Sequence, residues 1–370
     1  MKAFGVGCFN FGIRYKSEFL FDIKNHVKNI ELTLKKITAI GELTISYDED
    51  LEYSEHITEA PTKLSDGGDF PFFEFLEITF SLYIPSRIQS DLIGETAKYS
   101  LPGIEKFKVT MLPSWYGPVA FIECVDVLSE DCDPSTAVQV VREFLKKEFS
   151  KIDSEITFEC IGPSPFHVDF YISNKENEKV INQIEFSELE QKGYNKIVFK
   201  YNKDIFETED EAELHIYEEL TNELALFYAI TRENVIQMRS WLNIEESLEQ
   251  LNLMNQDQGL FKYLKNKYLA SNLRKKLINN LYVFKAENER YQHRVDHWIN
   301  EMYDNSDAIY LRKYIESRSG RESHYPVDSI CDWMKHEENR SMKYFELSVR
   351  FSTSVIGGII GAVITLMWGK

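Results

Sequence analysis

Residues 76–84 read LEITFSLYI, and this stretch decides the fold class of the first half of the chain. Apolar side chains occupy every second position from Leu76 to Ile84, and glutamate, threonine, serine and tyrosine occupy the positions between them. A period of two residues is typical of a β-strand with one buried face. We therefore predict a half-buried strand here.

The flanking sequence predicts further strands around this one. Apolar residues alternate with lysine and threonine at 107–111, a turn with proline and glycine follows at 113–118, and 119–127 completes a hairpin pattern. Asp133-Pro134 predicts the start of a helix that runs to about Phe149. Three more strands are expected, at 156–160, 166–172 and 197–201. The short connections favour a mostly antiparallel sheet.

The pattern changes near residue 204, where helical spacing replaces strand-like alternation. Thr208 and Glu211 fit a capping box, in which each side chain caps the first turn of a helix. One helical face then carries large apolar residues, namely Leu214, Tyr217, Leu220, Leu224 and Phe227. We expect several helices up to about Ser319, a break at 319–326, and a last helix from Asp328 that continues towards the C-terminus.

The C-terminal segment predicts a membrane span. No charged residue occurs between Phe351 and Trp368, and a helix of that length measures roughly 27 Å, close to the hydrocarbon thickness of a bilayer. The predicted fold class is therefore α+β, with a β-rich, mostly antiparallel head at 1–203, a helical domain at 204–345 and a single transmembrane helix at 346–370.

Composition is that of a folded protein in a reducing compartment. The 370 residues are 43% hydrophobic and carry a net charge of −18, which argues against a general nucleic-acid coat. Five scattered cysteines form no CxxC pair, and the N-terminal segment lacks the pattern of a signal peptide. We expect a single-pass protein of the cell inner membrane with its N-terminal bulk in the cytoplasm and the lipid bilayer as a partner.

The predicted span has a stripe of small residues that favours homo-oligomerisation. Lipid gives helices no hydrophobic reason to associate, so close approach through small side chains is the usual means. The stripe consists of Ser354, Gly357, Gly358, Gly361, Ala362 and Thr365. A ring of such helices would form a pore with a hydrophobic gate. The alternative is that these glycines have no role in association, because glycine is common in membrane helices.

A basic segment interrupts the acidic chain. Residues 258–286 contain no aspartate or glutamate, and tyrosines are interleaved with their cations. The candidate ligand-binding cations are Lys262, Lys265, Lys267, Arg274, Lys275 and Lys276. Such a segment suits a nucleotide or oligonucleotide, because cations neutralise phosphates while rings stack on bases. Anionic lipid headgroups and a solvated face that balances the acidic residues 204–223 are the alternatives.

The patterns of known catalytic and cofactor sites are missing from the sequence. His293 and His297 share a helical face but have no third ligand at metal spacing, and His167 with Asp169 has no identifiable nucleophile. Gly5 and Gly7 lack the third glycine of a dinucleotide fingerprint. We expect no enzyme activity, no cofactor and no metal site.

In layout, the chain resembles the membrane effectors of bacterial antiphage defence that respond to nucleotide signals. The small-residue stripe, the basic segment and the missing signal peptide carry this resemblance. It implies a closed oligomer that a nucleotide or oligonucleotide opens, so that the host membrane is disrupted. The alternative is a tail-anchored, non-catalytic scaffold or adaptor whose head binds a protein partner, and a membrane-tethered enzyme is a third hypothesis.

Overall fold

The computed structural model describes residues 1–14, 19–47, 54–57, 76–125, 127, 132–161, 165–173, 180, 182–191, 193–256, 260–305, 309–319 and 325–336. By compactness the chain divides into two units. Unit 1 comprises residues 1–236 and 294–321, and unit 2 comprises residues 237–293 and 322–370. Unit 1 contains the β-sheet, and we call it the β-domain.

The main sheet is built around its first strand, β1 (Lys2–Ile13). The other strands of this sheet are β3 (Ile40–Tyr47), β5 (Leu76–Tyr83), β6 (Lys106–Leu112), β7 (Val119–Cys124), β8 (Ile156–Ile161), β9 (Val168–Ile172), β10 (Ile184–Leu189) and β11 (Asn195–Tyr201). Their order is β10-β11-β9-β1-β7-β6-β5-β3, while β8 pairs with the second half of β1. A separate pair is formed by β2 (Phe19–Asp22) and β4 (Ser54–Ile57).

The sheet is almost entirely antiparallel, as predicted. Only β9 and β11 run parallel among the strand pairs of the described residues. The predicted strand at 76–84 is confirmed as β5, and the predicted hairpin at 107–127 is confirmed as the pair β6 and β7, with Leu112 opposite Val119 next to the turn. The alternation in sequence therefore identified the strands that form one half of the sheet.

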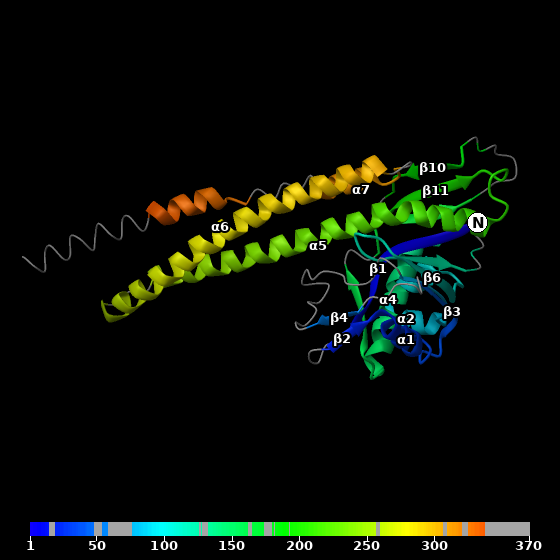
Figure 1. Cartoon of the computed structure of the whole chain (residues 1–370), viewed down its shortest axis with the longest axis horizontal. Helices are drawn as coiled ribbons and strands as arrows, with labels where there is room; N and C mark the ends of the chain where they lie inside the picture. The colour runs from blue at the N-terminus through cyan, green and yellow to red at the C-terminus, as the bar shows by residue number, and fades with distance from the viewer. Residues whose placement is uncertain are drawn as a thin grey trace, which may run out of the picture. The chain divides into compact units, whose positions relative to one another are not determined.

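One face of the sheet is covered by α1 (Ile23–Leu34), α2 (Ser86–Ile93), α3 (Thr96–Ser100) and α4 (Pro134–Lys151) (Figure 1). Helix α4 begins after Asp133, as predicted, and lies against β1. Two glycines of β1 make this contact close. A Cβ atom on Gly5 would lie 2.4 Å from the carbonyl oxygen of Pro134, and one on Gly7 would lie 2.9 Å from Val138. These glycines serve packing between helix and strand.

The opposite face has two halves. Over β1, β7 and β9 it carries aromatic side chains that pack against α5 (Glu209–Gln256). Tyr217 of α5 lies 4.8 Å from Phe4 and 4.2 Å from Phe121, measured between ring centroids, and Phe4 stacks on Phe170 at 5.1 Å. Over β3, β5 and β6 the same face carries half-buried and exposed polar residues instead. We call these the aromatic half and the polar half.

The helical part begins where the capping box was predicted. The Thr208 hydroxyl accepts a hydrogen bond from the Glu211 backbone N–H at 3.1 Å, and the Glu211 carboxylate accepts one from the Glu207 N–H at 3.0 Å. Four of the five residues of the predicted apolar face of this helix are buried, but Leu214 is 43% exposed. Leu214 was therefore placed wrongly, because it lies at the edge of the buried stripe.

Two further helices follow, α6 (Leu260–Asn305) and α7 (Arg312–Ser319), and residues 327–336 are also helical. In the β-domain, α6 lies beside α5 through an ion pair between Arg294 and Glu233 at 3.0 Å. In unit 2, side chains of α5, of α6 and of residues 327–334 form a separate apolar core around Trp241, Leu277 and Met334. Figure 1 shows α5 and α6 as the two longest helices.

The predicted fold class needs a correction. The chain is α+β, with a β-sheet domain and a helical domain, but none of the helices in the described ranges is both long and apolar enough to cross a membrane. Helices α5 and α6 have the length, but charged side chains recur along both. This finding also corrects the predicted inner-membrane location and membrane class. The segment 346–370, on which those predictions depended, lies outside the described residues.

Candidate ligand-binding cavity

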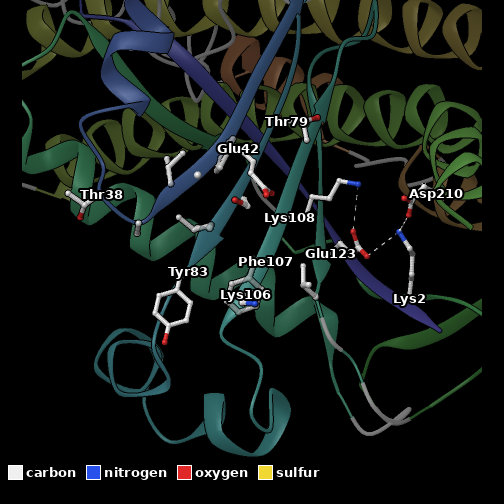
Figure 2. Close-up of a pocket in the computed structure, with 17 residues that line it drawn as sticks. Lys2, Thr38, Glu42, Thr79, Tyr83, Lys106, Phe107, Lys108, Glu123 and Asp210 are labelled. Atoms are coloured by element: carbon white, nitrogen blue, oxygen red, sulfur yellow. Dashed lines mark hydrogen bonds and ion pairs between the residues drawn. The ribbon is translucent and has the colours of Figure 1, made fainter.

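A cavity of about 780 Å³ lies on the polar half of the sheet (Figure 2). A volume of this size is typical of sites for small molecules. The charged and hydroxyl-bearing side chains that line it come from β1, β3, β5, β6, β7, α5 and the turn before β3: Lys2, Lys106 and Lys108; Thr38, Thr79, Ser81 and Tyr83; Glu42, Glu123 and Asp210. Strand alternation presents most of these groups on one face.

Lysines of β6 supply positive charge to the cavity. Lys106 and Lys108 are two residues apart, so both side chains project from the same face of the strand, and Phe107 between them is buried in the core on the other face. Ser81 of β5 is the register partner of Lys108, and Tyr83 is the partner of Lys106. The lysine side chains of β6 therefore lie next to hydroxyl-bearing side chains of β5.

The edge of the cavity is formed by an irregular part of β3. The pairing of β3 with β5 shifts register between Gly41 and Thr44, which is the pattern of a β-bulge. Glu42 lies inside this bulge and, among the described residues, is the one non-glycine with a positive φ, at 48°. Side chains larger than hydrogen disfavour this conformation, which is enriched at binding sites. The bulge brings the Glu42 carboxylate to the cavity.

At the boundary with the aromatic half, a cluster of ion pairs joins the sheet to the first turns of α5. The Lys2 ammonium donates to Glu213 Oε2 at 2.6 Å and to Asp210 Oδ1 at 2.7 Å, and it lies 3.4 Å from Glu123. Lys108 Nζ lies 3.6 Å from Glu213 and 3.9 Å from Glu123. Figure 2 shows Lys2 and Lys108 on either side of Glu123.

Burial changes the acid–base properties of this cluster. Burial, together with the neighbouring carboxylate of Glu213, raises the pKa of Glu123 to about 7 despite the two lysines. Burial alone would lower the pKa of Lys2, but its hydrogen bonds to Asp210 and Glu213 outweigh that effect and raise it. Lys2 therefore stays charged, while Glu123 is divided between its two forms near neutral pH.

The site residues predicted from the sequence lie elsewhere. Arg274, Lys275 and Lys276 lie on α6 in unit 2, the first half-buried and the other two exposed. Lys262, Lys265 and Lys267 are also α6 positions, but their side chains lie outside the described set. Among the described side chains, Arg274, Lys275 and Lys276 do not line the cavity. The predicted stripe of Ser354, Gly357, Gly358, Gly361, Ala362 and Thr365 lies outside the described residues.

The cavity residues were missed in the sequence analysis, although part of the signal was present. The polar face of the predicted strand at 107–111 holds Lys108, Lys106 comes directly before that strand, and the polar face of the neighbouring strand at 76–84 holds hydroxyl groups. Pairing these two strands places both sets side by side. Lys2 and Asp210 gave no local signal, because 208 positions separate them in the chain and only the tertiary fold brings them together.

No protein-family model matches this chain, and no curated protein and no solved structure is significantly similar to it. The geometry of the cavity is therefore the basis for assigning a function. Within the described ranges, no group of three or more histidine, cysteine, aspartate or glutamate side chains is arranged to hold a metal ion. The arrangement of ammonium, hydroxyl and carboxylate groups around an open space is suited to binding a polar small molecule.

Proposed function

We propose that this chain is a non-catalytic ligand-binding protein whose β-domain cavity binds a nucleotide. The observation that carries the proposal is the open cavity of about 780 Å³ with three lysines on its wall, in a chain whose net charge is −18. The proposal keeps the nucleotide ligand expected from the sequence. It moves the binding site from the basic segment of α6 to the sheet of the β-domain.

Lys106 and Lys108 are the groups best placed to hold phosphate. Both belong to the strand that lies beneath the cavity, and Lys108 is 39% exposed, with its ion-pair partners no closer than 3.6 Å. Ion pairs of that length leave the ammonium able to donate shorter hydrogen bonds to a phosphate oxygen. Hydroxyl groups from Thr79 and Ser81 on the adjacent strand add neutral donors beside these charges.

Tyr83, opposite Lys106 on the adjacent strand, and Glu42 on the bulge suit the base and sugar of a nucleotide. The ring of Tyr83 is 49% exposed and offers a surface on which a base can stack. Its hydroxyl is held in place because it donates to Glu105 at 2.8 Å. The Glu42 carboxylate on the bulge is an acceptor for sugar hydroxyl groups or for an exocyclic amine.

Isothermal titration calorimetry tests this proposal on the full-length chain. The probes are ATP, GTP, cyclic AMP and a cyclic dinucleotide, with adenosine as the uncharged comparison. We expect at least one phosphate-bearing probe to bind and adenosine to bind much more weakly. Lys106→Met and Lys108→Met should each weaken that binding about tenfold or more, because a charged hydrogen bond contributes about 1.5–3 kcal/mol.

Lys147→Met is the matched control, because Lys147 is an exposed lysine of α4, which packs on the opposite face of the sheet. It should leave the affinity unchanged. Absence of binding for every nucleotide tested would reject the proposal. Nucleotide binding that survives both lysine substitutions at full affinity would also reject this cavity as the site.

A further inference from the structure

We propose that unit 2 carries a surface for a second copy of this chain, in which α5 of one copy packs against α6 of the other. The surface lies on α5 residues 238–253 and α6 residues 275–283, and we call it the helical surface. The proposal is independent of the cavity, which belongs to unit 1.

The part of α5 in unit 2 buries one face and exposes apolar side chains on another. Trp241, Ile244 and Leu251 are buried in the core of the unit. Away from that core, Met238 is 57% exposed, Leu242 is 45% exposed and Leu253 is 59% exposed. These three residues share one face at 3.6 residues per turn, and the exposed Glu246 and Glu249 lie on that face among them. This mixed apolar and acidic face is suited to contact with a helix that presents apolar and basic side chains.

Charge complementarity identifies the second copy as the partner. Between residues 237 and 256, α5 carries three glutamates and one arginine, whereas α6 between residues 269 and 286 carries four cations and no acid. On α5, Glu246 and Glu249 are exposed among the apolar side chains of this face. On α6, Lys275 and Lys276 are exposed near Val283, which is itself 47% exposed.

These charges are not used within the described part of the chain. No ion pair joins Glu246, Glu249, Lys275 or Lys276 to another described residue. By contrast, Lys285 of the same helix pairs with Asp328 at 2.8 Å. If α5 of each copy lies against α6 of the other, the glutamates of α5 can pair with the lysines of α6 in both contacts. Packing α5 against α5 would instead bring glutamates together.

Sedimentation velocity of the full-length chain over a range of concentrations tests the proposal. We expect a concentration-dependent dimer or larger assembly. Leu242→Asp should weaken association at least tenfold, and Glu246→Lys with Glu249→Lys should do the same. Adding Lys275→Glu and Lys276→Glu to the second variant should restore association, because the charge pairs are then re-formed with reversed sign. Leu32→Asp, at an exposed leucine of α1, is the control.

Three results would overturn the proposal. A wild-type chain that is monomeric at about 100 µM would show that the surface does not bind a second copy. An assembly whose mass is unchanged by all these variants would place self-association elsewhere in the chain. A third result would also overturn it: a monomer that binds a single-stranded oligonucleotide and loses that binding with Lys275→Glu and Lys276→Glu. The basic face would then serve nucleic acid.

Discussion

The aromatic half and the polar half belong to the same face of the same sheet, yet they differ in almost every property. Beneath α5, the rings of Phe4, Phe121 and Tyr217 pack within 6.0 Å of one another and are almost fully buried. On the next two strands of the sheet, Lys108 of β6 and Thr79 of β5 line an open cavity. The candidate site therefore begins where α5 no longer covers the sheet, although the sheet itself continues beyond that point.

The two halves show how the same alternation of side chains along a strand can form either a buried aromatic core or an open polar surface. Strands β1 and β7 place aromatic residues on the face that α5 covers, because a fully covered face gains most from apolar burial. Strands β5 and β6 place polar residues on the same face, where water or a ligand reaches them. The lysine and carboxylate cluster of Lys2, Glu123 and Glu213 lies at the boundary between these two environments.

The largest effect on stability should come from removing a ring from the aromatic half. Phe4→Ala should destabilise the β-domain by about 4 kcal/mol, because Phe4 is fully buried and contacts three other aromatic rings. Thr79→Val, at a half-exposed position on the polar half, should change stability by less than about 0.5 kcal/mol. Urea denaturation followed by circular dichroism measures both. Similar costs for the two variants would contradict the distinction between the halves.

An intermediate effect is expected at the boundary. Lys2→Met removes the nearest cation from Asp210, Glu213 and Glu123, and Glu213, which is only 2% exposed, keeps Lys108 at 3.6 Å. Weakening the pairing of a buried carboxylate in this way should cost up to about 3 kcal/mol. Lys2→Arg should recover part of the loss, because it restores the charge. Lys147→Met, at an exposed lysine of α4, is the control and should cost less than about 0.5 kcal/mol.

The smallest expected effect is a change in the pH dependence of stability. The pKa of Glu123 is raised by burial to about 7, so the stability that this group contributes is present below about pH 4.5 and is lost as the pH rises through 7. The contribution of Glu123 to the urea midpoint of the wild type should therefore fall between pH 5 and pH 8. Glu123→Gln should flatten that fall.

Three other buried groups set the size of the remaining slope. Burial raises the pKa of Asp169 to about 6 and that of Glu223 to about 7, which adds to the fall, whereas burial lowers the pKa of His26 to about 4, which opposes the fall below pH 6.5. All three groups are unchanged in the Glu123→Gln variant, so the expected result is a difference between the two pH profiles. An identical profile in the variant would show that Glu123 is ionised normally in the folded chain.

Local sequence patterns predict the fold of this chain better than they predict its candidate site. Period-two alternation identified β5 and β6, and the capping box of Thr208 and Glu211 identified the start of α5, because these signals are local. The cavity was missed because it depends on contacts such as that between Lys2 and Asp210, which no local pattern reveals. The predicted ligand cations were chosen from charge density along the chain, which does not indicate where a cavity forms.

Helices α5 and α6 each pass from the β-domain into unit 2, so residues 237–293 are an insertion in the β-domain whose two ends lie at Ile236 and Arg294, and residues 322–370 complete unit 2. These ends are neighbours, because Arg294 pairs with Glu233. An insertion with this topology can gain or lose whole helical turns in both helices without altering a strand. In evolutionary terms, the length of these helices is free to vary while the sheet stays constant, and a short turn that joins residues 236 and 294 should leave the sheet of the β-domain folded.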